Sequence, residues 1–423
     1  MSEAFLHFVW GNKLYYPEGL YTNNNELIEV VSPGIHNNDS GPDFFNSQIK
    51  INGTLWAGNT EIHIKSSDWY RHGHHLDPAY NNVILHIAEE IDEDVYTADN
   101  RKISTLKLPY SPGMLNEFYN LEFPAHSIPC AGKLQSVEKI IWINWLERLK
   151  TERLERKSEE IFKDLEKNKN HRELTFFIYL TRHFGFGKNS DPFEQIARSI
   201  PFSTLEKCRT NRLKTEALLF GQAGMLNNTT GDDYYQKLKT EYEFIKHKWN
   251  LTPINSSLLK LSKIRPQNFP VIRLSLLAGL ICKPAFTFSN LMNITDIQYL
   301  KSIFQSEVSE YWQSHFSFEK EHAKKIKILG KSAVSALLIN VFVPNIFVYG
   351  KQNNSEVHVN FAMEILENNE SENNSIIAEW EKYGISADNA GTAQALIQLK
   401  KEYCDKKKCL YCHIGYQVLK MQK

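Results

Sequence analysis

The chain has 423 residues, long enough for two or three domains. It is 42% hydrophobic, 12% aromatic and 23% charged, which excludes disordered and fibrous proteins. Lysine plus arginine and aspartate plus glutamate both total 49, so the formal net charge is zero. No overall field draws the molecule to nucleic acid or acidic membranes, and any basic surface must be local.

Two apolar stretches of the sequence indicate where in the cell the protein is expected to be. The opening residues, MSEAFLHFVWGN, contain Glu3 and lack a basic leader, so they do not resemble a secretory signal and we expect a cytoplasmic protein. Residues 332–350 carry no charge over 19 positions, the length of a membrane span. Asn340, Pro344 and Asn345 interrupt them, which predicts a buried helix that ends in a turn at Pro344. We expect no membrane association.

The first part of the chain alternates apolar and polar residues between turn signals. Because both central positions of a type I′ turn need positive φ, Asn52-Gly53 predicts a hairpin of residues 44–51 with 54–65. Pro78 predicts one short helix, capped by Asp77. We expect an α+β domain over residues 1–125, with the remaining strands at 27–31, 81–87 and 102–108.

After about residue 125 the apolar residues recur at helical spacing. We see no internal repeat of fixed period. The fold class is therefore α+β, a mixed-sheet core followed by a mostly α-helical domain over residues 126–423 that ends in a Cys-rich motif. Its predicted helices include LTFFIYLTRHFG, FEQIARSI, TEALLFGQAGML, DDYYQKLKTEYEFIKHKW, VIRLSLLAGLIC, EVHVNFAMEILEN and TAQALIQLKKEYC.

Acidic residues stand on both sides of the predicted hairpin. Asp43 ends a Gly-Pro-Asp run, and Glu61, His63 and Lys65 share one face of the second strand. The hairpin would bring these groups together. Carboxylates can hold Mg²⁺ or Mn²⁺, which activates water and stabilises charge at a phosphate, while His63 or Lys65 orients the water. A half-exposed strand beside an ordinary turn has the same pattern, so the non-catalytic interpretation also stands.

The order of Pro-Asp, one hairpin and Glu-x-basic resembles the PD-(D/E)XK nuclease core, an α/β fold with a metal-dependent site. The resemblance covers about the first 125 residues and implies phosphodiester hydrolysis. The chain departs from the usual pattern, because His63 stands two residues after Glu61 and the lysine arrives at Lys65. Either His63 replaces the usual lysine, or His63 and Lys65 divide the acid and base roles differently, or the site is degenerate.

The loop after this strand, SSDWYRHGHHLD, is dense in histidine and aspartate. His72 and His74 are candidates to ligate a transition metal, to assist a general base or to contact phosphate when protonated. A transition-metal hydrolase or transferase of another class would use the same loop. The alternative is a polar loop whose histidines bond backbone carbonyls, which is our expectation for His75.

Over its whole length the chain resembles a bacterial family, domain of unknown function 2851. This resemblance implies no activity, since none is established for the family. The motifs that carry it recur in order over nearly all of the chain: FLHFVW, GPDFFN, WAGNTEIHIKSSDWYRHGH, YNNVILHI, IPC, EALLFGQAG, RPQNFPVIR and YCDKKKCLYCHIG.

Six cysteines are too few for a disulfide framework in a reducing compartment. Cys404, Cys409 and Cys412 form a C-x4-C-x2-C array whose spacing lets a turn wrap one ion. The adjacent His413 is expected to point elsewhere, so Cys130 is the expected fourth ligand. Zinc or an iron–sulfur cluster suits four thiolates; the alternative is four ordinary thiols.

Residues 400–423 hold seven lysines against two acidic residues, a local basic patch that either contacts phosphates or is a solvated helix end. Together these features predict a metal-dependent nuclease with nucleic acid as its candidate partner. The alternative is a non-catalytic nucleic-acid or protein binding module on a degenerate nuclease core. The sequence leaves open the substrate, DNA against RNA, the metal and the oligomeric state.

Overall fold

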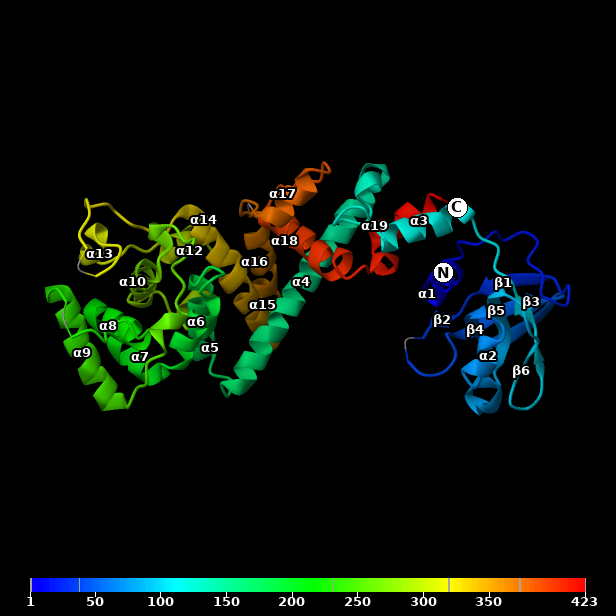
Figure 1. Ribbon diagram of the computed structural model, residues 1–423, viewed down its shortest axis with the longest axis horizontal. Helices are drawn as coiled ribbons and strands as arrows, with labels where there is room; N and C mark the ends of the chain where they lie inside the picture. The colour runs from blue at the N-terminus through cyan, green and yellow to red at the C-terminus, as the bar shows by residue number, and fades with distance from the viewer. Residues whose placement is uncertain (1, 38, 230, 319, 373, 423) are drawn as a thin grey trace. The chain divides into compact units, whose positions relative to one another are not determined.

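The computed structural model describes residues 2–37, 39–229, 231–318, 320–372 and 374–422 (Figure 1). The chain forms two compact units. The first comprises residues 1–146, 382–384 and 398–423, and the second comprises residues 147–381 and 385–397. The expected domain over residues 1–125 lies within the first unit. The Cys-rich segment, which we expected to end the helical domain, also groups with the first unit.

The first unit is built on a six-stranded mixed sheet in the order β1-β3-β4-β5-β8, with β2 paired to β3 (Figure 1). β4 pairs parallel with β5, and β5 with β8, whereas β3 is antiparallel to its neighbours β1, β2 and β4. A separate ribbon pairs β6 with β7. The strands are β1 (Ile28–Ser32), β2 (Ile35–His36), β3 (Phe44–Ile51), β4 (Thr54–Lys65), β5 (Val83–Glu90), β6 (Val95–Tyr96), β7 (Lys102–Ile103) and β8 (Thr105–Leu106).

The predicted hairpin is confirmed. β3 and β4 flank Asn52 and Gly53, whose φ angles are 49° and 81°, as a type I′ turn requires. Since β5 runs parallel to β4, the chain must cross over between them, and it does so through short helical turns. Asp77 accepts a hydrogen bond from the Ala79 amide at 2.9 Å, which confirms the predicted cap of the turn at Pro78.

Short helices complete the first unit. α4 begins in this unit and continues into the second one. Near the end of the chain, α19 contacts α3, the 3₁₀ turn η3 and the preceding turn η8. The elements are α1 (Glu3–Gly11), α2 (Asp68–Arg71), η1 (His74–Leu76), η2 (Pro78–Tyr80), α3 (Pro112–Glu122), η3 (Ala131–Ser136), α4 (Lys139–Lys167), the π-helical η7 (Leu399–Cys404), η8 (Cys409–Tyr411) and α19 (His413–Lys420).

The second unit is helical, and its buried apolar side chains form one continuous core that includes Phe184, Phe220 and Trp312. Together with the mixed sheet, this confirms the predicted fold class. Its helices are α5 (Arg172–Phe184), α6 (Ser190–Arg198), α7 (Phe202–Cys208), α8 (Arg212–Gln222), α9 (Asp233–Trp249), η4 (Ser256–Leu258), η5 (Pro266–Asn268), α10 (Pro270–Ile281), α11 (Phe288–Met292), α12 (Ile297–Phe304), α13 (Glu310–Ser314), α14 (Lys331–Leu337), the π-helical η6 (Leu338–Phe342), α15 (Val343–Gln352), α16 (Glu356–Glu367), α17 (Ser375–Glu381) and α18 (Ala390–Gln398).

The prediction that a helix ends at Pro344 is wrong. One helix runs from Lys331 to Gln352 through the π turn of η6. Pro344 follows the π turn of η6, where the hydrogen-bond pattern is shifted, and the adjacent Asn345 side chain donates to the Val341 carbonyl at 2.7 Å. This helix is long and apolar enough to cross a membrane, but 72% of its most apolar window is buried, as in a core helix. The expectation of no membrane association stays a prediction.

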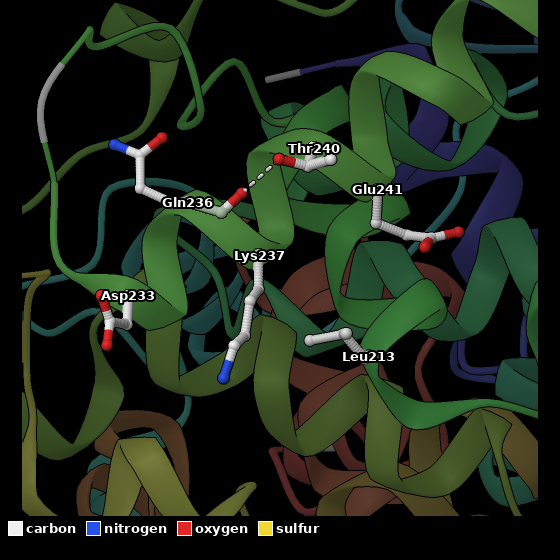
Figure 2. A pocket seen from close by; sticks show the side chains of 6 residues that line it. All are labelled: Leu213, Asp233, Gln236, Lys237, Thr240 and Glu241. Atoms are coloured by element: carbon white, nitrogen blue, oxygen red, sulfur yellow. Dashed lines mark hydrogen bonds between the residues drawn. The ribbon is translucent and has the colours of Figure 1, made fainter.

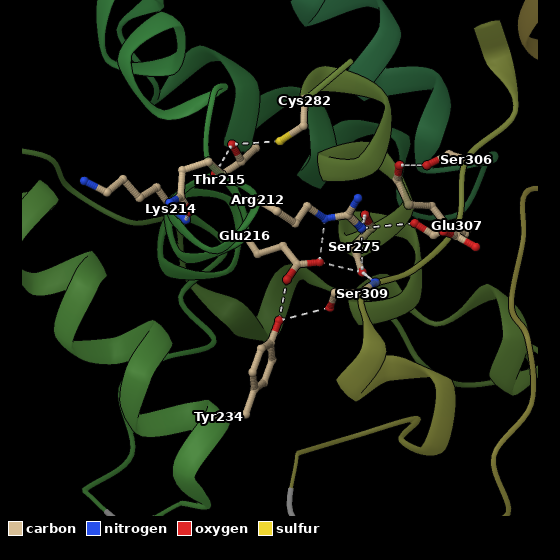
Figure 3. A network of polar contacts seen from close by, with 12 residues as sticks. Arg212, Lys214, Thr215, Glu216, Tyr234, Ser275, Cys282, Ser306, Glu307 and Ser309 are labelled. Carbon is tan, nitrogen blue, oxygen red and sulfur yellow. Dashed lines mark hydrogen bonds and ion pairs between the residues drawn. The ribbon is translucent and has the colours of Figure 1, made fainter. Parts of the chain in front are cut away.

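A polar network lies inside the helical unit (Figure 3). The Glu216 carboxylate, 1% exposed, pairs with Arg212 at 3.1 Å and accepts hydrogen bonds from the hydroxyls of Ser275 and Tyr234. Arg212 also donates to the Ser275 carbonyl at 2.6 Å. Nearby, a shallow depression of about 490 Å³ lies over α8 and α9, lined by Leu213, Asp233, Gln236, Lys237, Thr240 and Glu241 (Figure 2).

Candidate metal centre on the mixed sheet

The two predicted acidic residues lie side by side. Asp43 immediately precedes β3, and Glu61 lies on β4, where its neighbour Thr60 is paired with Phe44. The Asp43 amide donates to Glu61 Oε2 at 2.9 Å, and the Ile62 amide donates to Asp43 Oδ2 at 2.9 Å. This exchange of backbone and side-chain bonds fixes both carboxylates at the same place on the sheet.

Three histidines gather next to Glu61. His63 comes from β4, and the crossover loop brings His72 and His74 back over the strand, so that one nitrogen of each lies within 4.8 Å of those of the other two. Glu61 Oε1 lies 3.3 Å from His74 Nε2 and 3.7 Å from His63 Nε2. Among the described residues, a set of three or more potential metal ligands within 4.8 Å of one another is found at these three histidines.

Packing holds the loop histidines in place. The His74 ring stacks on the Tyr80 ring with centroids 3.9 Å apart, and its side chain is 12% exposed. Trp69, fully buried, donates its indole N–H to the Tyr96 carbonyl at 2.9 Å and so anchors the crossover. Gly73 has a φ of +78°, which lets the chain turn between His72 and His74.

His86 on β5 supports His63 from behind. Its Nε2 lies 2.9 Å from His63 Nδ1, and its other ring nitrogen lies 3.3 Å from the Thr105 hydroxyl. Burial, followed by the neighbouring histidines, lowers the pKa of His63 to about 2. Burial, followed by His74, lowers the pKa of His86 to about 3. His63 is therefore neutral, the form in which imidazole binds metals.

Helix α1 supplies a further histidine that sequence reasoning missed. His7 Nε2 lies 3.2 Å from Asp43 Oδ2, and the His7 ring packs edge-on against Phe44. Burial opposes protonation of His7, but the hydrogen bond and charge of Asp43 outweigh it, so the pKa of His7 is raised. His36 on β2 lies beside it, with 3.4 Å between ring nitrogens.

One predicted side chain points to another partner. Lys65, though on the same strand as Glu61, pairs with Glu90 Oε2 at 2.9 Å and is 48% exposed. His75, which we expected outside the site, has its ring against Tyr70, with centroids 5.0 Å apart. The candidate centre therefore draws on Glu61, the three histidines and the adjacent Asp43–His7 pair.

The donor set fits a divalent transition metal. Three imidazoles and a carboxylate suit iron, zinc or manganese, whereas Mg²⁺ prefers oxygen ligands and retains several waters. Burial is the main cause of a raised Glu61 pKa, and the Asp43 charge adds to it while the His74 hydrogen bond opposes it. A cation at this point would offset both the burial and the repulsion between the carboxylates.

The comparisons with known proteins concern the family and not the chemistry. The family model "Protein of unknown function (DUF2851)" matches residues 3–375. The chain belongs to this family. No curated protein and no solved structure matches it. For this DUF2851 protein, an assignment of activity rests on the geometry of the site.

Proposed function

We propose that this DUF2851 protein hydrolyses phosphodiester bonds with a divalent transition-metal ion held by Glu61 and the three histidines of the first unit. The observation that carries the proposal is the convergence of Glu61 on His63 and His74, with Asp43 bonded to Glu61 through its amide. Pro-Asp at the start of β3 and Glu-x-His on β4 are the positions at which the chain resembles the PD-(D/E)XK nucleases.

The protein groups have distinct tasks in this proposal. A divalent ion held by Glu61 and the three histidines would supply Lewis acidity toward a phosphate oxygen and would lower the pKa of a nearby water. Asp43, beside Glu61 and 22% exposed, is placed to hold that water by accepting its hydrogen bond. His7, whose pKa the contact with Asp43 raises, is the candidate proton donor to the departing oxygen. The attacking water passes one proton to Asp43 as its oxygen bonds to phosphorus, while the P–O bond to the leaving group breaks and the departing oxygen takes a proton from His7.

The test uses the full chain with Mn²⁺, Zn²⁺ or Mg²⁺ on bis(4-nitrophenyl) phosphate and on single- and double-stranded DNA and RNA. We expect turnover of at least one substrate, fastest with a transition metal. Glu61→Gln should lower the rate by about 100-fold or more, since it removes a ligand charge. The matched control is Glu90→Gln on β5, whose carboxylate is 58% exposed and pairs with Lys65, and it should leave the rate unchanged.

Equal rates for wild type and Glu61→Gln would overturn the proposal. Salt-sensitive binding of nucleic acid without metal-stimulated turnover would also overturn it and would favour the binding module on a degenerate core. The Asp43→Ala variant tests the role of Asp43 in holding the attacking water. If Asp43→Ala keeps its metal and its full activity while His72→Ala loses the metal, Asp43 does not have that role.

A further inference from the structure

A second cluster of metal-binding residues lies in the first unit. Four of the six cysteines belong to this unit, and they come from two segments of the chain, residues 1–146 and 398–423. Cys130 precedes η3, Cys404 ends η7, Cys409 begins η8 and Cys412 caps the N-terminus of α19. Cys130, Cys404 and Cys412 are 6–9% exposed, and Cys409 is partly buried.

The four thiols are close enough to influence one another. Burial raises the pKa of Cys409 to about 12, and Cys412 adds to the rise. Burial and the remaining three thiols, led by Cys130, likewise raise the pKa of Cys404. Gly415 permits the tight turn, because a Cβ there would lie 2.2 Å from the Cys409 carbonyl oxygen. η8 contacts both η7 and α19, and α19 contacts η3, so the elements that carry the four thiols pack together.

Burial raises the pKa of all four thiols, and a few nearby groups oppose that rise. The backbone amides of Ile414 and Gly415 and the Trp145 indole donate toward the Cys412 sulfur and lower its pKa, against the dominant effect of burial. Amide donors to sulfur stabilise the anion. The positive charges of Lys400 and Lys407 act in the same direction on Cys404 and Cys409. These groups would offset the negative charge of a thiolate-bound metal centre.

His413 does not compete with the cysteines for this role. Its ring stacks on the Trp145 indole, with centroids 4.5 Å apart and planes 6° from parallel. That leaves Cys130 as the fourth sulfur ligand, consistent with the sequence-based expectation.

Sulfur spacing distinguishes a single ion from a cluster. At a Zn–S distance of about 2.3 Å, tetrahedral geometry places the four sulfurs about 3.8 Å apart. In the part of the chain that the structure describes, the ligand nitrogens of His63, His72 and His74 lie within 4.8 Å of one another, whereas no three of the cysteine sulfurs do. No three of these thiols therefore have the close spacing of a single zinc site, whereas the thiolates that bind a polynuclear centre lie further apart.

We propose that one [4Fe–4S] cluster is bound by four thiolates of the first unit, those of Cys130, Cys404, Cys409 and Cys412. The cluster would join the last segment of the chain to η3 within this unit. It is independent of the histidine centre, because no ligand is shared.

The test is the composition of the full chain, produced and purified without oxygen. We expect about four iron and about four acid-labile sulfide per chain, with visible absorbance that dithionite bleaches. Cys409→Ser should lose most of the iron and sulfide. Cys208→Ser is the matched control, because Cys208 is buried in α7 of the helical unit, and it should retain both.

Wild-type protein without iron and sulfide would overturn the proposal whether or not the variants fold. One zinc per chain without sulfide would overturn it as well, because it would show a single ion. Equal iron content in Cys409→Ser and Cys208→Ser would exclude the assigned ligands. Glu61→Gln should keep the full cluster, so failure of the hydrolase proposal leaves this measurement unaffected.

Discussion

Replacing Glu61 by glutamine should stabilise the metal-free protein at neutral pH. The Glu61 side chain is 6% exposed, and burial, with a further contribution from Asp43, raises its pKa above 4.5. Above pH 4.5 the unfolded chain releases this proton while the folded state retains it, so stability falls as the pH rises until the folded-state pKa is passed. Each unit of rise in the pKa costs about 1.4 kcal/mol at neutral pH.

Glutamine keeps an oxygen acceptor for the Asp43 amide but carries no charge. We therefore expect the free energy of unfolding of Glu61→Gln to exceed that of wild type by about 0.5–2 kcal/mol at pH 7, the range typical of single stabilising substitutions. The gain should vanish at a pH below 4, where Glu61 is protonated in both states. The measurement is urea unfolding of the full chain with a chelator present, followed by circular dichroism at both pH values.

Bound metal should reverse the order of stability of wild type and Glu61→Gln. Mn²⁺ at a hundred times its dissociation constant stabilises a binding-competent protein by about 2.7 kcal/mol, and wild type should gain more from it than Glu61→Gln. Glu90→Gln, which changes an exposed ion pair, should stay within about 0.5 kcal/mol of wild type throughout. A metal-free Glu61→Gln protein that is less stable than wild type at pH 7 would refute the reasoning, because the hydrogen bonds of Glu61 would then outweigh its buried charge.

Two further predictions concern the helical unit. Gly221→Ala should destabilise it by about 1–3 kcal/mol in thermal unfolding, because the added carbon would lie 2.0 Å from the Tyr242 ring. The same change in a Tyr242→Ala background should be neutral or mildly stabilising, and equal losses in both backgrounds would contradict the contact. Glu216→Ala should cost about 3 kcal/mol in urea unfolding, because Arg212 and two hydroxyls lose a buried acceptor. A loss below about 1 kcal/mol would show that water replaces the carboxylate.

Local rules predicted the hairpin. The Asn52-Gly53 turn set the register from Ile51 opposite Thr54 to Ser47 opposite Gly58. The register then shifts between Ser47 and Phe44, so that Phe44 pairs with Thr60, and this irregularity, which the turn does not predict, sets how Asp43 meets Glu61. The helical segments also followed from their apolar period. The same periodicity could not foresee the continuation of the helix at Pro344, because it depends on a π turn and an asparagine side chain.

The missed histidines depend on long-range packing. His7 reaches Asp43 because α1 packs against β4, and His86 reaches His63 because β4 and β5 are parallel neighbours. Neither relation has a signature in the spacing of residues along the chain. A histidine within an apolar helix, as in FLHFVW, was the available signal for His7, and such a histidine is more often an ordinary core residue. Conversely, the alternation that placed Lys65 with Glu61 could not reveal its partner Glu90.

The division of the chain into units has a consequence for biosynthesis. Residues 398–423 belong to the first unit but are translated after the whole of the second. A nascent chain can pack its helical unit on the ribosome, whereas the sheet unit must wait for its final segment. Any protein whose synthesis stops early would carry a finished second unit and an unfinished first one, with three of the four clustered cysteines missing.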